Sequence, residues 1–80
     1  MKMNYEHIKW ACRRGMLELD LILTPYVLER YPTASPAEQT VFIDFLASAD
    51  QDLFDWLLKK KQPSDPRFSK MIEVLLHDPH

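Results

Sequence analysis

The residues best suited to recognition chemistry lie around Gly15, the only glycine in this chain of 80 residues. Gly15 is preceded by Arg13 and Arg14, and the carboxylates of Glu18 and Asp20 follow it. Charges of both signs beside a backbone that a partner can approach closely are typical of a recognition surface. The plainer interpretation is two capped helices, with cations in the last turn of the first and acids in the first turn of the second.

Groups for catalysis are poorly placed in this segment. On a helix, Glu18 and Asp20 project roughly 200° apart, so they cannot act as an acid–base pair. Cys12 and His7 face different directions on the same helix, which argues against a nucleophile–base pair. Cys12 is most simply a small core residue. We therefore expect a binding protein and not an enzyme, with no catalytic residue.

The sequence offers little for a metal ion or a cofactor. His77 and His80 are three residues apart near the chain end, with no third ligand nearby in the sequence. A glycine-rich phosphate loop cannot be built with one glycine. We expect neither a metal site nor a resident cofactor.

Length and charge indicate one small domain spanning residues 1–80. A hydrophobic fraction of 46% can supply its core, and a net charge of −2 argues against binding nucleic acid. The single cysteine cannot form an internal disulfide, and no apolar run approaches the roughly 20 residues that span a bilayer. These features predict a cytoplasmic protein that does not insert into a membrane and is monomeric when free.

Helical periodicity predicts five helices and no strand. The first three are expected over about 4–14, 16–30 and 35 to 47 or 48. The fourth should run from Asp50 or Asp52 to the lysines 59–61, and the fifth from Asp65–Pro66 to about 76. Ser35 and Asp65 are each followed by proline, which marks a helix start, and Asn4 is the expected N-cap of the first helix. The later helices should bury the following residues: Val41, Phe42, Phe45, Leu46, Ala49, Leu53, Phe54, Leu57, Leu58, Phe68, Met71, Ile72, Leu75 and Leu76.

The second helix is apolar nearly all round and should lie at the centre of the bundle. We expect only a narrow strip, formed by Glu18, Pro25 and Glu29, to face water. Pro25 removes a backbone donor, which predicts a kink or break near Thr24. The expected fold is an all-α, compact five-helix bundle around a central, proline-kinked second helix.

The first helix should place Tyr5, Ile8 and Cys12 on its core face. Trp10 falls nearly opposite, on the side of His7 and Arg14. Either a neighbouring helix covers this tryptophan, or it is an exposed anchor for a partner.

The charged residues of the corner have different expected environments. Gly15 should end the first helix in the left-handed conformation. Asp20 points toward apolar neighbours, so we expect it to form an ion pair or a cap that holds the corner, with Arg13 or Arg14 as candidate partners. Glu18 lies on the exposed strip and is the better candidate for contact with another protein.

The segment from Trp10 to Asp20, with the sequence WACRRGMLELD, resembles the signature of the FAD assembly factors of succinate dehydrogenase. That family is built around an Arg-Gly-x-x-Glu motif, which here runs from Arg14 to Glu18. A second segment, 52–57, resembles the family's fourth-helix pattern. The chain departs from the family at 59–61, where lysines stand in place of a frequent glycine.

The resemblance implies an assembly factor that binds the flavoprotein subunit of succinate dehydrogenase, and that of fumarate reductase. It would promote covalent attachment of FAD, a cofactor of the client, to a client histidine. Carried onto this sequence, the contact surface would centre on Arg14, Gly15 and Glu18 and would include further residues of the same segment: His7, Trp10 and Asp20. The alternative is an antitoxin-like or regulatory protein that binds a toxin or operator DNA.

Overall fold

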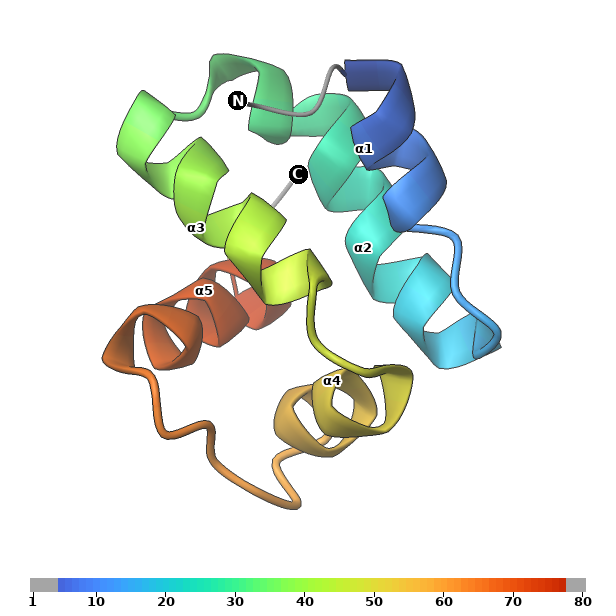
Figure 1. The fold of residues 1–80 in the computed structure, drawn as a ribbon, viewed down its shortest axis with the longest axis vertical. Helices are drawn as coiled ribbons and strands as arrows, with labels where there is room; N and C mark the ends of the chain where they lie inside the picture. The colour runs from blue at the N-terminus through green and yellow to red at the C-terminus, as the bar shows by residue number, and fades with distance from the viewer. Residues whose placement is uncertain (1–4, 78–80) are drawn as a thin grey trace.

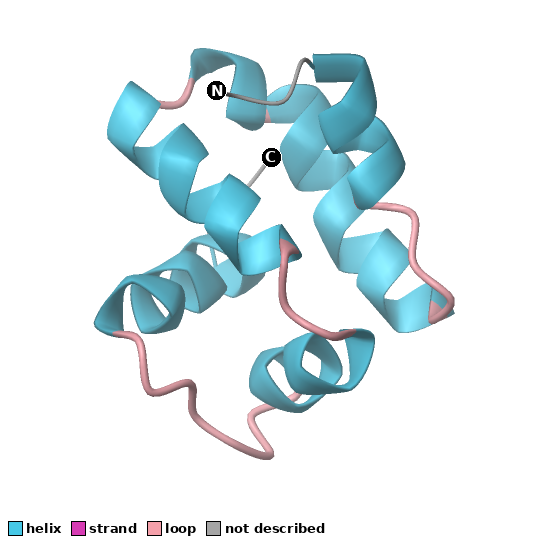
Figure 2. Ribbon diagram, in the orientation of Figure 1, coloured by secondary structure: helices cyan, strands magenta, loops and turns pink. Residues whose placement is uncertain are grey.

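The computed structural model describes residues 5–77, which form helices connected by loops and contain no strand (Figures 1 and 2). The predicted all-α class and the five α-helices are confirmed. Within the described range, no helix is long and apolar enough to cross a bilayer. The expected N-cap Asn4 lies outside the described residues. The elements are α1 (Tyr5–Ala11), α2 (Leu17–Glu29), the 3-10 helix η1 (Tyr31–Thr33), α3 (Pro36–Leu46), α4 (Asp50–Leu57) and α5 (Pro66–His77).

Helix α2 is the common neighbour of the other elements, as predicted. It contacts α1, η1, α4 and α5, and Figure 1 shows α1 and α2 on one side of the molecule, with α3 and α5 on the other. Its inward face buries Leu19, Leu23, Tyr26 and Val27. Tyr26 also donates a hydrogen bond to Glu38 Oε2 at 2.6 Å, which satisfies its hydroxyl inside the core.

The outward face of α2 differs from the prediction. The helix continues through Pro25, so the predicted break near Thr24 does not occur, whereas the alternative of a kink there stays a prediction. The solvent-facing part of α2 is wider than the predicted strip and includes Leu17, Leu21 and Leu28, each of which is more than half exposed. A bundle of this size supplies neighbours for only part of the circumference of its central helix, so apolar residues on the remaining part face water.

Local start signals are confirmed at α3 and α5. The Ser35 hydroxyl accepts from the backbone N–H of Glu38 at 3.1 Å. The Asp65 carboxylate accepts from the backbone N–H of Arg67 at 2.9 Å. Both bonds occupy donors that have no partner within the first turn of a helix.

Most of the predicted core is confirmed, with two exceptions at the ends of α4. Ala49 and Leu58 are exposed, since they are the N-cap and C-cap of α4 and lie outside its buried face. Tyr31, which lies between the predicted second and third helices, is buried in η1. The other predicted core residues of α3, α4 and α5 are buried or pack against the core.

The lysine run after α4 adopts a specific turn. Lys59 has a φ of 62°, in the left-handed region that usually favours glycine. The N–H of Lys60 bonds the carbonyl of Asp55 at 2.8 Å, and the N–H of Lys59 bonds that of Trp56 at 3.1 Å. This is the Schellman pattern. Lysine therefore takes the conformation for which glycine is suited.

Candidate functional site: the corner between α1 and α2

The corner is formed by residues 12–16, which connect α1 to α2 without regular helical structure. Helix α1 ends at Ala11, so Arg14 does not lie in its last turn as we predicted. The prediction of a left-handed Gly15 is also wrong, because this glycine has no positive φ. The reason is that α1 already ends in a turn in which the N–H of Arg13 bonds the carbonyl of Trp10 at 2.9 Å. Carboxylates then bind the N–H groups of the next two residues, Arg14 and Gly15, so no left-handed cap forms at Gly15.

Asp20 holds one side of the corner from the first turns of α2. Its Oδ1 accepts a hydrogen bond from the backbone N–H of Arg14 at 2.8 Å. The predicted structural role of Asp20 is thus confirmed, although the partner atom is a backbone amide and not a guanidinium. Its role in contacting another protein stays a prediction.

Asp50, the first residue of α4, holds the other side. Its Oδ2 accepts from the backbone N–H of Gly15 at 3.3 Å, and its Oδ1 lies 3.4 Å from Nε of Arg14. This Nε is buried and makes no hydrogen bond with any described residue, so it contacts Asp50 as an ion pair. Sequence reasoning missed Asp50 in this role and identified it only as a possible helix start.

The Arg14 side chain is 18% exposed and faces mostly inward. Its terminal nitrogen donates a hydrogen bond to the backbone carbonyl of Leu46, the last residue of α3. Arg14 therefore links the corner to the ends of two other helices. This link is a structural role that the motif alone did not indicate.

Four residues of the predicted surface face solvent at or near the corner. Glu18 is exposed and has no hydrogen-bond or ion-pair partner within residues 5–77. Gly15 is also exposed. The side chain of Trp10 is 70% exposed, which resolves its two interpretations in favour of an uncovered aromatic. His7 lies exposed one helical turn before Trp10 on α1.

Cys12 is not part of this surface. It is fully buried among the core residues. Burial raises the pKa of its thiol from 9.0 to about 12, although the nearby Arg14 opposes the shift. Its complete burial confirms its interpretation as a core residue.

No metal-binding cluster accompanies the corner in the part of the chain that the structure describes. Residues 5–77 contain no group of three or more His, Cys, Asp or Glu side chains that could hold a metal ion. His77 lies 3.1 Å from Glu73, whereas His80 lies outside the described residues.

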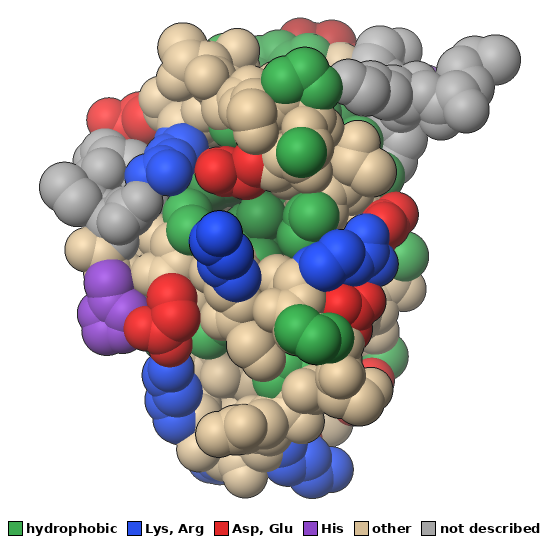
Figure 3. Space-filling model, turned by 90° about the vertical axis from the view of Figure 1, so that its left-hand side faces the viewer, with side chains coloured by type: hydrophobic (Ala, Val, Ile, Leu, Met, Phe, Trp, Pro, Cys, Tyr) green, Lys and Arg blue, Asp and Glu red, His purple; other side chains and the backbone are tan. Residues whose placement is uncertain are grey.

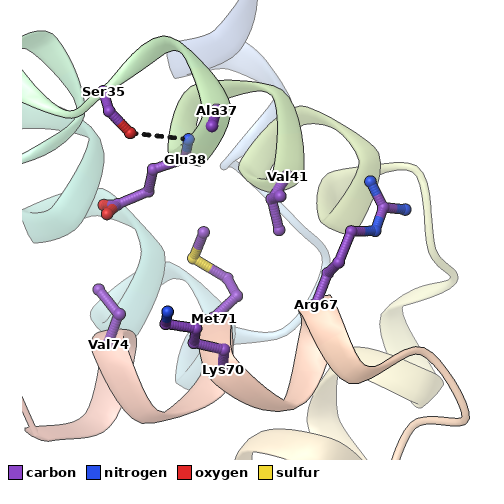
Figure 4. Close-up of a pocket in the computed structure, with 8 residues that line it drawn as sticks. All are labelled: Ser35, Ala37, Glu38, Val41, Arg67, Lys70, Met71 and Val74. Carbon is purple, nitrogen blue, oxygen red and sulfur yellow. Dashed lines mark hydrogen bonds between the residues drawn. The ribbon is translucent and has the colours of Figure 1, made fainter.

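A groove of about 260 Å³ lies between α3 and α5, away from the corner. Val41 and Met71 point toward each other across it (Figure 4). Figure 3 shows the corresponding face of the molecule, with basic side chains beside an apolar patch. None of the corner residues lines this groove, which separates it from the candidate site.

Comparison with known proteins identifies the family. Residues 6–78 match the model of a family described as the flavinator of succinate dehydrogenase. The chain is 37% identical over 67 residues to the FAD assembly factor SdhE of Pseudomonas putida, a match that covers 84% of this chain and 80% of that protein. It is 42% identical over 72 residues to SdhE of Photorhabdus laumondii, covering 90% and 82%. Both relatives are FAD assembly factors. The chain belongs to the family of flavinators of succinate dehydrogenase.

Proposed function

We propose that this protein binds the flavoprotein subunit of succinate dehydrogenase, and that of fumarate reductase, and promotes covalent attachment of FAD to a client histidine. The family match over residues 6–78 supports this function. The observation that carries it is the corner, where Asp20 and Asp50 hold the backbone of the Arg-Gly-x-x-Glu motif while Glu18 faces solvent. A surface held in this way can meet a partner with little loss of conformational entropy.

The absence of a side chain at Gly15 is best explained by an approaching partner. Its φ is not positive, so the backbone conformation does not require glycine. A Cβ placed there would meet only Asp50 Oδ2, at 3.9 Å, which is ordinary van der Waals contact. Internal packing therefore leaves room for a side chain, and glycine instead lets the client approach the backbone closely.

Glu18 supplies the charge that remains available at the corner. Its carboxylate has no partner within residues 5–77, so it can pair with a cation or an N–H group of the client without breaking an internal bond. Arg14 contributes differently, because its guanidinium already joins the corner to Leu46 and Asp50. We assign Arg14 to positioning the motif and Glu18 to contacting the client.

The mechanism we propose is catalysis by positioning. Docking holds the client so that its bound FAD and its acceptor histidine stay in reacting geometry. The reacting groups belong to the client and to FAD, and this protein contributes neither a reacting side chain nor a cofactor of its own. It acts as a monomer, in the cytoplasm.

The test is a flavinylation assay with client subunit that lacks FAD. The client is mixed with FAD in the presence and absence of this protein, and covalent flavin is followed by its fluorescence in a denaturing gel. We expect faster and more complete attachment with the protein present. Equal rates and yields in both reactions would refute the function.

A matched pair of variants tests the site in the same assay. Glu18→Ala should reduce the stimulation of attachment. Glu73→Ala removes an exposed carboxylate from α5, which contributes no residue to the corner, and should leave it unchanged. Equal stimulation by both variants would place the client contact elsewhere on the protein.

A further inference from the structure

The outward face of α2 carries an exposed row of leucines, which we call the leucine stripe: Leu17, Leu21 and Leu28. These residues are 68%, 67% and 53% exposed. Positions i, i+4 and i+11 fall within about 40° of one another around a helix and extend along roughly 16 Å of its length. The three residues therefore share one face of the helix, on which Thr24 lies between Leu21 and Leu28.

The leucine stripe is unusual for a surface helix. Single exposed apolar residues are common, but an aligned set on one helix face is typical of an interaction site. The opposite face of α2 is also apolar and is buried in the core. Core formation therefore accounts for the leucines of that face and leaves those of the stripe without a role in folding.

The charges beside the stripe indicate the character of its partner. Glu18 and Glu29 lie about 90° around α2 from the stripe, both on the same side of it. Both are exposed, and neither has an ion-pair partner within residues 5–77. An apolar ridge with one acidic edge complements an apolar hollow that has basic side chains along one rim.

The stripe is continuous with the corner. Leu17 lies inside the Arg-Gly-x-x-Glu motif, next to Glu18, and the stripe extends from there toward the far end of α2. A specific interface needs about 800 Å² from each partner, which is roughly a sixth of the 5032 Å² surface of this protein. The few exposed residues of the corner cannot supply that area without a neighbouring surface.

We propose that the leucine stripe is the second half of the client contact. It packs into an apolar hollow on the flavoprotein subunit whose rim is basic on the side that meets Glu18 and Glu29. This inference rests on the proposed function and adds to it the region of α2 beyond the motif, together with the chemistry of the client surface.

The test uses titration calorimetry to measure the affinity of this protein and its variants for the client subunit that lacks FAD. Leu21→Gln and Leu28→Gln keep helix propensity and side-chain length while removing apolar surface. We expect each to weaken binding several-fold and the double variant to weaken it roughly tenfold or more. Leu58→Gln is the matched control, since Leu58 is 43% exposed but lies at the end of α4.

The acidic edge is tested by the association rate. Glu29→Lys should slow association and reduce its dependence on ionic strength, because the client rim is proposed to be basic. Thermal melting of all variants checks that they fold, and unchanged melting temperatures are expected because the altered side chains are exposed. An association rate unaffected by Glu29→Lys would contradict the basic rim.

The possible outcomes separate this inference from the proposed function. If the unaltered protein does not bind the client, the proposed function fails and this inference fails with it. If Glu18→Ala weakens binding while the double leucine variant binds normally, the proposed function stands and the stripe is overturned. If sedimentation shows a dimer that only the double variant dissociates, with client affinity unchanged, the stripe joins two copies of this chain and the inference is wrong.

Discussion

Asp50 contacts both Arg14 and Gly15 in the corner, although it lies 35 residues from Gly15 along the chain. One carboxylate oxygen lies 3.4 Å from Nε of Arg14, and the other accepts from the N–H of Gly15 at 3.3 Å. Arg14 also donates to the carbonyl of Leu46. The corner, the end of α3 and the start of α4 are thereby held together by one arginine and one aspartate.

Replacing Asp50 should loosen the corner. We expect Asp50→Ala to lower the free energy of unfolding by about 1 kcal/mol, because the ion pair is partly exposed and is accompanied by a single backbone hydrogen bond. Urea denaturation measures the change. Asp52→Ala serves as the control, since Asp52 lies in the same first turn but has no partner within the described residues. Equal losses in the two variants would show that only the helix dipole is involved.

Arg14 and Glu18 should separate stability from function. Arg14→Ala leaves the Leu46 carbonyl without its donor, so we expect a loss of roughly 1–3 kcal/mol in the free energy of unfolding and reduced flavinylation. Glu18→Ala should change that free energy by less than about 0.5 kcal/mol while flavinylation falls. The neighbouring Arg13, which is exposed, provides the control Arg13→Ala. A fully stable Arg14→Ala variant would contradict the structural role assigned to Arg14.

Gly15→Ala isolates the contact with the client. Neither backbone strain nor a close internal contact opposes a methyl group at this position. We expect the free energy of unfolding to be unchanged or to rise by up to about 1 kcal/mol, because alanine restricts the unfolded chain. Flavinylation should nevertheless fall, since the methyl group would meet the approaching client. Denaturation and flavinylation assays on the same sample measure both effects, and full activity would refute the close approach.

The buried thiol of Cys12 should be unreactive in the folded protein. Burial raises its pKa to about 12, so a much smaller fraction is thiolate at pH 8 in the folded protein than in urea. Because the thiolate is the form that reacts, alkylation of the folded protein should be slower than alkylation in urea by at least about a hundredfold. The folded state holds this proton more tightly than the unfolded state. Stability is therefore present in full below pH 9 and falls as the pH rises from 9 toward 12. Equal alkylation with and without urea would place the thiol at the surface.

The left-handed residue after α4 offers a stabilising substitution. Lys59→Gly should raise the free energy of unfolding by about 0.5–1 kcal/mol, because glycine adopts a φ of 62° without a steric penalty. The ion pair of Lys59 with Glu73 is more than half exposed and offsets little of this gain. Lys60→Gly is the control and should not stabilise, since Lys60 has no positive φ. Thermal and urea denaturation compare the two variants.

The helices, their starts and most of the core follow from short-range chemistry in the chain. Ser35 and Asp65 each bond an N–H group two or three residues away, so the relevant partners are visible in the sequence itself. The end of α2 was likewise predicted to within one residue. Apolar spacing was sufficient to place Ile8 of α1 and Cys12, just after that helix, in the core.

The corner and the outward face of α2 depend on groups that are distant in the sequence. The conformation of Gly15 and the partners of Arg14 are set by Leu46 and Asp50, and backbone carbonyls and acids like these occur throughout the chain. Exposure of Leu17, Leu21 and Leu28 depends on where α1, α4 and α5 pack around α2, which the periodicity of α2 does not encode. Local hydrogen bonds and spacing could therefore be predicted from the residues alone. Long-range contacts required the folded chain, because many partners of the same chemical type compete until packing selects one.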